Sequence, residues 1–132
     1  MSASGPPVVK PRPVYLNLAR IRLPLPGLVS ILHRISGAAL FLFAIPLGLF
    51  AVQTSLESAG GFAILKSMFA NPLGKLVLVG LLWAYLHHFF AGIRYLLLDL
   101  HVGDDLRPAR QSSVVVLGAS LALTLIIAVR LW

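Results

Sequence analysis

The longest apolar stretch of the chain runs from Pro72 to Leu100 and contains two adjacent histidines, His87 and His88, followed by Arg94. At about 1.5 Å of rise per residue, a helix of this length spans roughly 44 Å, enough to cross a hydrocarbon core of about 30 Å with polar ends. Ionisable side chains at such depth are rare and usually face the interior of a helix bundle. The stretch is therefore predicted to be a membrane-spanning helix that carries a functional site.

The composition agrees with an integral membrane protein. Of 132 residues, 58% are hydrophobic and 11% are charged, and the mean hydropathy is +0.92, which excludes a soluble globular domain. Lysine and arginine outnumber acidic residues by 11 to 4, but they lie beside the apolar stretches, as topology signals do, so no nucleic-acid partner is expected. Cysteine is absent, which excludes disulfides and thiolate ligands, so histidine or carboxylate would have to hold any metal.

The chain is predicted to be an all-α membrane protein with three transmembrane helices. The spans are expected at about residues 28–52, 72–99 and 113–131. Together, residues 28–131 would form a transmembrane anchor domain behind an N-terminal tail of residues 1–27. The tail is rich in proline and is expected either to lie on the membrane surface or, over residues 1–11, to be disordered.

The segments between the spans are less apolar. Residues 53–71 are expected to form a loop with room for a short interfacial helix, and residues 101–112 a polar turn in which Pro108 stops any helix. Pro46 is expected to kink the first span. In the third span, Ser120 and Thr124 are interpreted as helix-packing residues without a catalytic role.

The orientation follows from the distribution of lysine and arginine. Eight of these residues lie on the N-terminal side or close to the second loop, and three lie in the first loop or at the C-terminus. The positive-inside rule then places the N-terminus and the second loop in the cytoplasm. With no secretory signal in the tail, we expect a multi-pass protein of the bacterial inner membrane whose C-terminus is periplasmic.

A second polar cluster lies near the start of the first span. Ser30, His33, Arg34 and Gly37 recur at three- and four-residue steps and therefore share one helical face. The alternative is that Arg34 extends to the lipid headgroups and that His33 has no role. Three polar side chains together on one face favour a binding site.

The two polar clusters are predicted to lie on the same side of the membrane, with His33 roughly 9 Å and His88 roughly 16 Å from the helix ends. That difference suits a haem whose iron is held by His88 while its propionates approach His33 and Arg34. The helical face of His88 includes the small residues Ala84, Ala91 and Gly92 beside two tyrosines, whereas Trp83, Phe90 and Arg94 share the face of His87. The alternative is that either histidine hydrogen-bonds to a carbonyl of a neighbouring helix. A bis-histidine haem would need its second ligand from a partner chain.

Two spaced signatures in this sequence resemble the cytochrome b556 subunit family of succinate dehydrogenase. The first is RPxxxxL, at Arg12 to Leu18, followed by SxxHRxS, at Ser30 to Ser36. The second is HxxxGIRxxxxD, at His88 to Asp99. The likeness extends over residues 12–131.

The resemblance implies a membrane anchor of respiratory complex II that binds haem b and passes electrons to its substrate, ubiquinone. Its expected partners are a flavoprotein subunit, an iron-sulfur subunit and a second small anchor, which would complete the helical bundle and supply the second haem ligand. By position, His88 would be the axial ligand and His33 and Arg34 the propionate contacts. Ser30, Arg34 and Asp99 would form the quinone site.

Three other classes of protein could carry some of the same residues. The anchor of a related fumarate reductase would carry the same residues. A proton-coupled transporter could use His33, Arg34 and His88 as a relay, but it would need an acidic residue facing the pathway, and Asp99 lies only at the margin of its span. A structural scaffold without a cofactor is the third alternative.

Overall fold

The computed structural model describes residues 21–132, and the expectations for the tail before residue 21 lie outside this range. Within residues 21–132 the structure contains helices and no strand, as predicted. Its elements are α1 (Leu25–Ala39), the π-helical turn η1 (Leu40–Ala44), α2 (Ile45–Glu57), α3 (Ala59–Ala70), α4 (Pro72–Asp99) and α5 (Leu106–Leu131). Three of the helical stretches in this range are long and apolar enough to cross a membrane: Leu25–Glu57, Pro72–Asp99 and Leu106–Leu131.

The first of these stretches is continuous but changes its winding near the middle. Pro46 has no N–H to donate, and its ring would clash with the carbonyl four residues earlier in a regular α-helix. The π-helical turn at Leu40–Ala44 lies just before that proline and provides the extra room. Where the sequence predicted a kink at Pro46, the structure has a π-helical turn directly before the proline.

Local sequence signals explain the two middle helices. Ser58 caps α3, because its side chain accepts a hydrogen bond from the Gly61 N–H at 3.0 Å. Asn71 caps α4 in the same way through the Leu73 N–H at 2.9 Å, and Pro72 occupies the first helical position, where a missing N–H costs nothing. The short helix expected between residues 53 and 71 is therefore confirmed as α3.

The start of α5 corrects the sequence interpretation. The helix begins at Leu106, so Pro108 lies inside it instead of stopping it. Proline is tolerated there because N–H groups of the first turn have no partner within the helix in any case. The turn between α4 and α5 uses positive φ angles at His101 (58°) and Gly103 (77°), which reverse the chain in fewer residues than expected.

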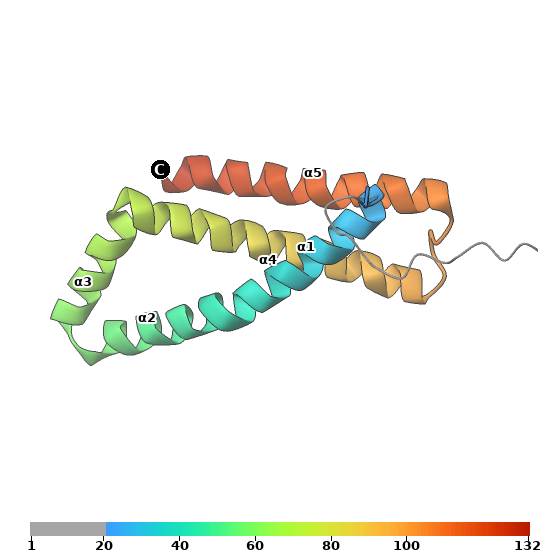
Figure 1. Ribbon diagram of the computed structural model, residues 1–132. Coiled ribbons are helices and arrows are strands. Elements are labelled where there is room, and N and C mark those ends of the chain that lie inside the picture. The colour runs from blue at the N-terminus through green and yellow to red at the C-terminus, as the bar shows by residue number, and fades with distance from the viewer. Residues whose placement is uncertain (1–20) are drawn as a thin grey trace, which may run out of the picture.

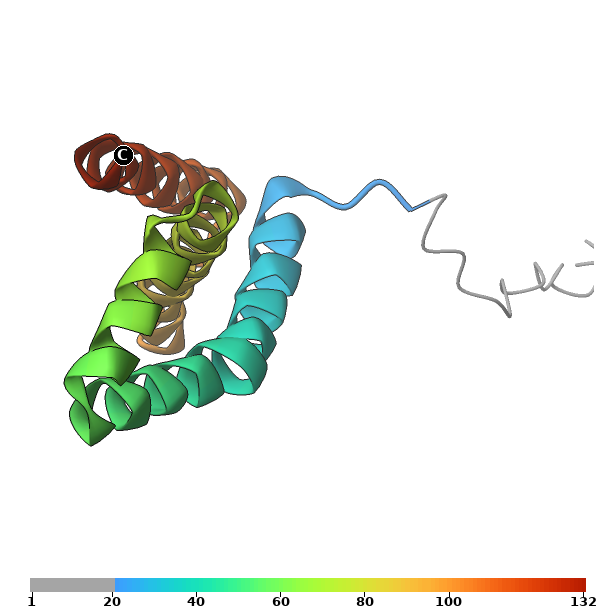
Figure 2. The same ribbon diagram turned by 90° about the vertical axis from the view of Figure 1, so that its left-hand side faces the viewer.

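The helices α4 and α5 lie side by side over most of their length, and α1 crosses α4 near its C-terminal half (Figure 1). Beyond this crossing α2 diverges from α4, and α3 closes the far end of the resulting triangle (Figure 2). The small core lies where α1, α4 and α5 meet, at Val29, Ala91 and Val116.

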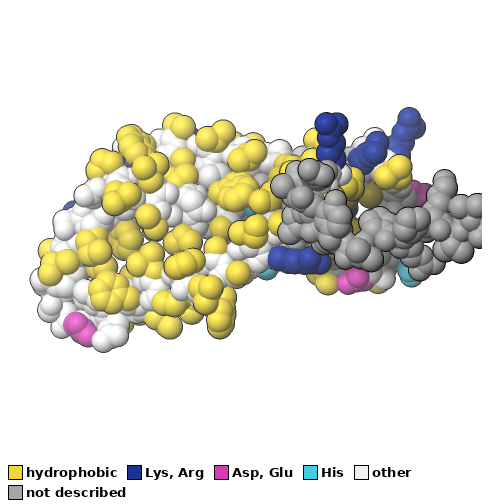
Figure 3. Space-filling view, in the orientation of Figure 1, with side chains coloured by type: hydrophobic (Ala, Val, Ile, Leu, Met, Phe, Trp, Pro, Cys, Tyr) yellow, Lys and Arg dark blue, Asp and Glu magenta, His cyan; other side chains and the backbone are white. Residues whose placement is uncertain are grey.

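Much of the remaining surface is apolar, as expected for helices that face lipid (Figure 3). Most of the lysine and arginine side chains visible there gather at the end where α1 begins and α4 meets α5. The polar clusters predicted from the sequence lie in the half of the molecule nearer that end.

Candidate functional site

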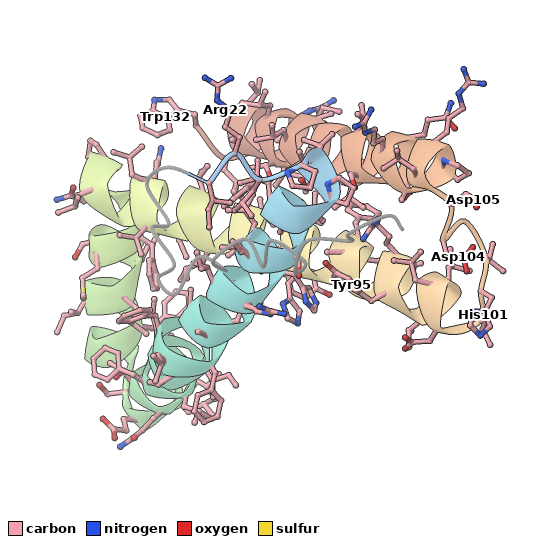
Figure 4. The ribbon with its side chains drawn as sticks, turned by 45° about the vertical axis from the view of Figure 1, so that its right-hand side comes forward. Arg22, Tyr95, His101, Asp104, Asp105 and Trp132 are labelled. Atoms are coloured by element: carbon pink, nitrogen blue, oxygen red, sulfur yellow. The ribbon has the colours of Figure 1, made fainter. Side chains whose placement is uncertain are left out.

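The crossing of α1 over α4 brings the two predicted polar clusters together. The imidazole rings of His33 on α1 and His88 on α4 stack with their centroids 4.2 Å apart and an interplanar angle of 12°. Tyr95, two turns further along α4, lies 5.1 Å from the His33 ring, and Figure 4 shows it beneath the crossing. The prediction that the start of the first span meets the second half of the second span is supported by this geometry.

A hydrogen bond across the crossing defines the chemical state of His88. Its Nδ1 lies 3.1 Å from the backbone carbonyl oxygen of His33. A carbonyl oxygen only accepts hydrogen bonds, so Nδ1 must carry the proton and donate it. In the neutral ring the other nitrogen, Nε2, then has a free lone pair. This is the arrangement that metal-binding histidines commonly have, with one ring N–H fixed by a carbonyl and the opposite nitrogen available to a metal.

Ser36 completes this contact. Its hydroxyl donates to the same His33 carbonyl at 2.9 Å, and its Oγ lies 3.4 Å from Nδ1 of His88. The side chain is 3% exposed, although it is polar and lies within a membrane span. Sequence reasoning placed Ser36 in a signature but gave it no role, because nothing in the sequence shows that it would face His88.

Gly37 allows the close approach of the two helices. A Cβ atom added at this position would lie 2.8 Å from Cε1 and 3.2 Å from Nδ1 of His88, closer than ordinary contacts allow. The imidazole of His88 therefore occupies the space that a side chain at position 37 would take. The sequence indicated Gly37 as a member of the polar face, and the structure gives the reason for its size.

The two adjacent histidines have different surroundings. His87 is 0% exposed and faces the interior of the three-helix core. Its ring packs on Trp83 at 5.4 Å, and neither ring nitrogen has a hydrogen-bond partner within residues 21–132. His88 is half-buried and lies on the side of α4 that faces α1. Only His88 is thus accessible to a group that approaches from outside this chain.

The three predicted quinone-site residues lie at the edge of the crossing or beyond it. Ser30 is half-buried, one turn before His33 on α1, and Arg34 is exposed. Asp99 is the last residue of α4, also exposed, and lies roughly 16 Å along the helix from His88. Within the described part of the chain no ion pair joins Asp99 to Arg34. The fold of this chain alone therefore brings Ser30 and Arg34 near the histidines but leaves Asp99 apart.

Sequence reasoning also missed a polar contact between α4 and α5. Arg94 is 6% exposed and donates from Nε to the Ser112 hydroxyl at 2.9 Å and from Nη2 to the Ala109 carbonyl at 3.4 Å. The sequence placed Ser112 in a turn, and the only signal for this contact was an arginine within an apolar span without an acidic neighbour. The earlier start of α5 brings the serine hydroxyl within reach of Arg94.

Comparisons with known proteins bear on the same residues. Residues 9–127 match the model of the family described as succinate dehydrogenase/fumarate reductase transmembrane subunit. This range includes both signatures in full and therefore every predicted site residue.

Three curated proteins are similar to the chain along most of its length, and each is called a succinate dehydrogenase cytochrome b556 subunit. The protein from Paracoccus denitrificans is 33% identical over 87% of this chain and 88% of its own. The protein from Coxiella burnetii is 35% identical over 92% of this chain and 97% of its own. The protein from Rickettsia felis is 26% identical over 96% of this chain and 98% of its own.

Proposed function

The chain belongs to the succinate dehydrogenase/fumarate reductase transmembrane subunit family, and from this premise we propose that it is the haem b- and ubiquinone-binding anchor of a succinate dehydrogenase. Three apolar helices and the family make it a multi-pass membrane protein. The curated relatives carry a b-type cytochrome in their names, which supports haem b as the cofactor.

The observation that carries the proposal is the hydrogen bond from His88 Nδ1 to the His33 carbonyl. It leaves Nε2 free as an iron ligand and fixes the ring so that it cannot rotate away. The fully buried His87 has no hydrogen-bond partner within residues 21–132 that would fix its ring, and a haem would have to displace the α1/α4/α5 core to reach it. The donor set at the crossing therefore fits an axial ligand at His88.

The other residues of the crossing suit the edge of the same cofactor. His33 and Arg34 lie next to the ligand and can donate to haem propionates, with Arg34 able to form a paired, charge-assisted contact. When bound, haem b supplies a one-electron redox centre. His33, the other half-buried histidine at the crossing, is assigned to the propionates, so we propose that the second axial ligand comes from the second anchor subunit.

Ser30 and Arg34 also have the chemistry of a quinone site. A hydroxyl and a guanidinium can donate hydrogen bonds to a quinone carbonyl oxygen, and these bonds strengthen as negative charge develops on that oxygen during reduction. Reduced ubiquinone takes up protons from water, and the exposed carboxylate of Asp99 at the end of α4 could relay them from the membrane surface. We assign binding to Ser30 and Arg34, and proton transfer to Asp99.

The proposed assembly contains a flavoprotein subunit, an iron-sulfur subunit and the second small anchor. The chain lies in the bacterial inner membrane with its N-terminus in the cytoplasm and its C-terminus in the periplasm, as the positive-inside rule predicts. The end that carries most visible arginines then faces the subunits from which electrons arrive (Figure 3). The anchor of a fumarate reductase is the alternative within the same family.

A matched pair of substitutions tests the proposal. His88→Leu and His87→Leu each replace one adjacent histidine by a residue of similar size that cannot bind iron. In the purified complex, His88→Leu should abolish the b-type signal in a reduced-minus-oxidised spectrum, while His87→Leu should retain it. Loss of the signal only in His87→Leu would show that the ligand was assigned wrongly. A wild-type complex without any haem absorbance would favour a cofactor-free scaffold or a transporter.

A further inference from the structure

A groove of about 390 Å³ lies between the C-terminal part of α4 and the N-terminal part of α5. Its walls are almost entirely apolar and include Ile93 and Leu97 on α4 and Val115 and Ala119 on α5. One charged side chain, Arg94, lines it. The proposed haem and quinone sites do not use this groove.

Arg94 is a buried cation whose charge is not neutralised. The guanidinium has five N–H groups, and the contacts to Ser112 and to the Ala109 carbonyl use two of them. Both acceptors are uncharged, and within residues 21–132 no carboxylate lies within ion-pair distance of Arg94. Arg94 also lies 5.4 Å from the centre of the Tyr95 ring, and its remaining donors are free to bind an anion that this part of the chain does not supply.

The depth of Arg94 matches the headgroup region of a bilayer. It lies five residues before the end of α4, which corresponds to roughly 7.5 Å along the helix axis. Its acceptors Ala109 and Ser112 lie at a similar distance from the start of α5. An anion at this level can enter from the membrane surface.

The groove opens on the side of α4 away from the proposed haem ligand. Leu97 follows His88 by nine residues, which at about 100° per residue places it roughly 180° around the helix. The second anchor subunit must approach the His88 side in order to share the haem. Lipid is therefore the neighbour expected on the opposite side.

We propose that this groove binds one anionic phospholipid, with its phosphate on Arg94 and an acyl chain along the apolar walls of α4 and α5. A single cation at one end of an apolar groove fits an amphiphile with an anionic head. The guanidinium can bind two phosphate oxygens at once. A zwitterionic lipid should bind more weakly, because the cation in its headgroup lies beside the phosphate and competes with the guanidinium. The identity of the neighbour as lipid rests on the proposed haem ligand, and the choice of the cytoplasmic leaflet rests on the proposed orientation.

Lipid binding to the purified complex tests this site. The complex is stripped of lipid in detergent and supplied with phosphatidylglycerol, with phosphatidylcholine of the same acyl chains, or with inorganic phosphate. Retained lipid is counted by native mass spectrometry, and stabilisation is followed by the melting midpoint. The wild-type complex should retain phosphatidylglycerol and melt at a higher temperature with it, and should respond little to the other two.

Two matched pairs of variants localise the effect. Arg94→Gln should weaken phosphatidylglycerol binding about tenfold, whereas Arg110→Gln, which removes an exposed arginine from the same end, should leave it nearly unchanged. Val115→Trp fills the groove from an exposed position and should reduce retention of the lipid. Val114→Trp, one residue earlier and outside the groove, should not.

Four results would overturn the proposal. Equal retention of phosphatidylglycerol and phosphatidylcholine would show that the net charge of the lipid headgroup does not matter for binding. Stabilisation by inorganic phosphate that depends on Arg94 would indicate a free anion instead of a lipid. Loss of the second anchor subunit from Val115→Trp, with lipid retention unchanged, would show that protein covers the groove. If Arg94→Gln does not assemble, equal lipid retention by Val115→Trp and Val114→Trp decides against the site.

Discussion

Substitution of Gly37 by alanine should disturb the proposed haem ligand without removing any functional group. The new Cβ would lie 2.8 Å from Cε1 of His88, whereas carbon atoms in contact prefer about 3.5 Å or more. The imidazole must therefore retreat by roughly 0.7 Å, or α1 must move away from α4. The Nδ1 atom of His88 is now 3.1 Å from the His33 carbonyl, and a retreat of that size would break the hydrogen bond.

The energetic effect can be estimated from its components. Overpacking at a close helix crossing costs about 1–3 kcal/mol, and loss of the hydrogen bond costs about 1 kcal/mol more. Alanine gains at most about 1 kcal/mol over glycine from helix propensity. We therefore expect a net destabilisation of about 1–3 kcal/mol, together with weaker or altered haem binding.

The assay compares Gly37→Ala with Gly48→Ala in the purified complex. Gly48 lies in the same membrane-spanning stretch, and a Cβ there would meet nothing within 4 Å. The melting midpoint and the reduced-minus-oxidised haem spectrum are recorded for both variants after their subunit content has been checked. Gly37→Ala should lower the melting midpoint and reduce or shift the haem signal. Gly48→Ala should not lower the midpoint and should leave the haem signal unchanged.

Identical behaviour of the two variants would refute this reasoning. It would mean that α1 and α4 are not packed as closely at His88 as the structure shows, or that His88 does not hold the haem. A lower melting midpoint of Gly37→Ala with an unchanged haem spectrum would support the close packing of α1 and α4 but would contradict the assignment of His88 as the haem ligand.

Three further substitutions give distinct expectations. Ser36→Ala removes the second oxygen near Nδ1 of His88, so the ligand should become less basic and the haem midpoint potential should rise by roughly 20–60 mV in a redox titration; an unchanged potential would show that the 3.4 Å contact has no electronic effect. Arg34→Ala should lower succinate-to-quinone activity about tenfold or more while activity with an artificial acceptor persists, and equal loss of both activities would indicate a role in assembly alone. Gly103→Ala places a side chain at φ 77° and should destabilise the turn by about 1–2 kcal/mol in thermal melting, whereas Gly118→Ala, in open space, serves as the control; equal melting of the two would contradict the strain argument.

The sequence by itself determined the class of the protein and its elements. The length of an apolar stretch and the bilayer thickness are enough to predict a spanning helix, because a membrane forces backbone groups to pair within the segment. That argument correctly gave an all-α protein with three spans and placed the second one at Pro72–Asp99. Local chemistry also indicated Pro46 as an irregular point of the first span, where the structure has a π-helical turn, and left room for the short helix before Asn71. The family followed from two signatures, which the comparisons confirm.

Only the tertiary structure decided which polar residues meet. The contact of Ser36 and the His33 carbonyl with His88 joins positions more than fifty residues apart, and its geometry depends on the crossing of α1 and α4. Neither the periodicity of the sequence nor a motif predicts where the two helices cross, because the crossing results from the packing of side chains on two separate helices. The start of α5 is a similar case, since Pro108 allowed both a turn and a first helical turn. Because α5 starts earlier than expected, the Ser112 hydroxyl reaches Arg94. The sequence could not show that this buried cation has uncharged hydrogen-bond partners.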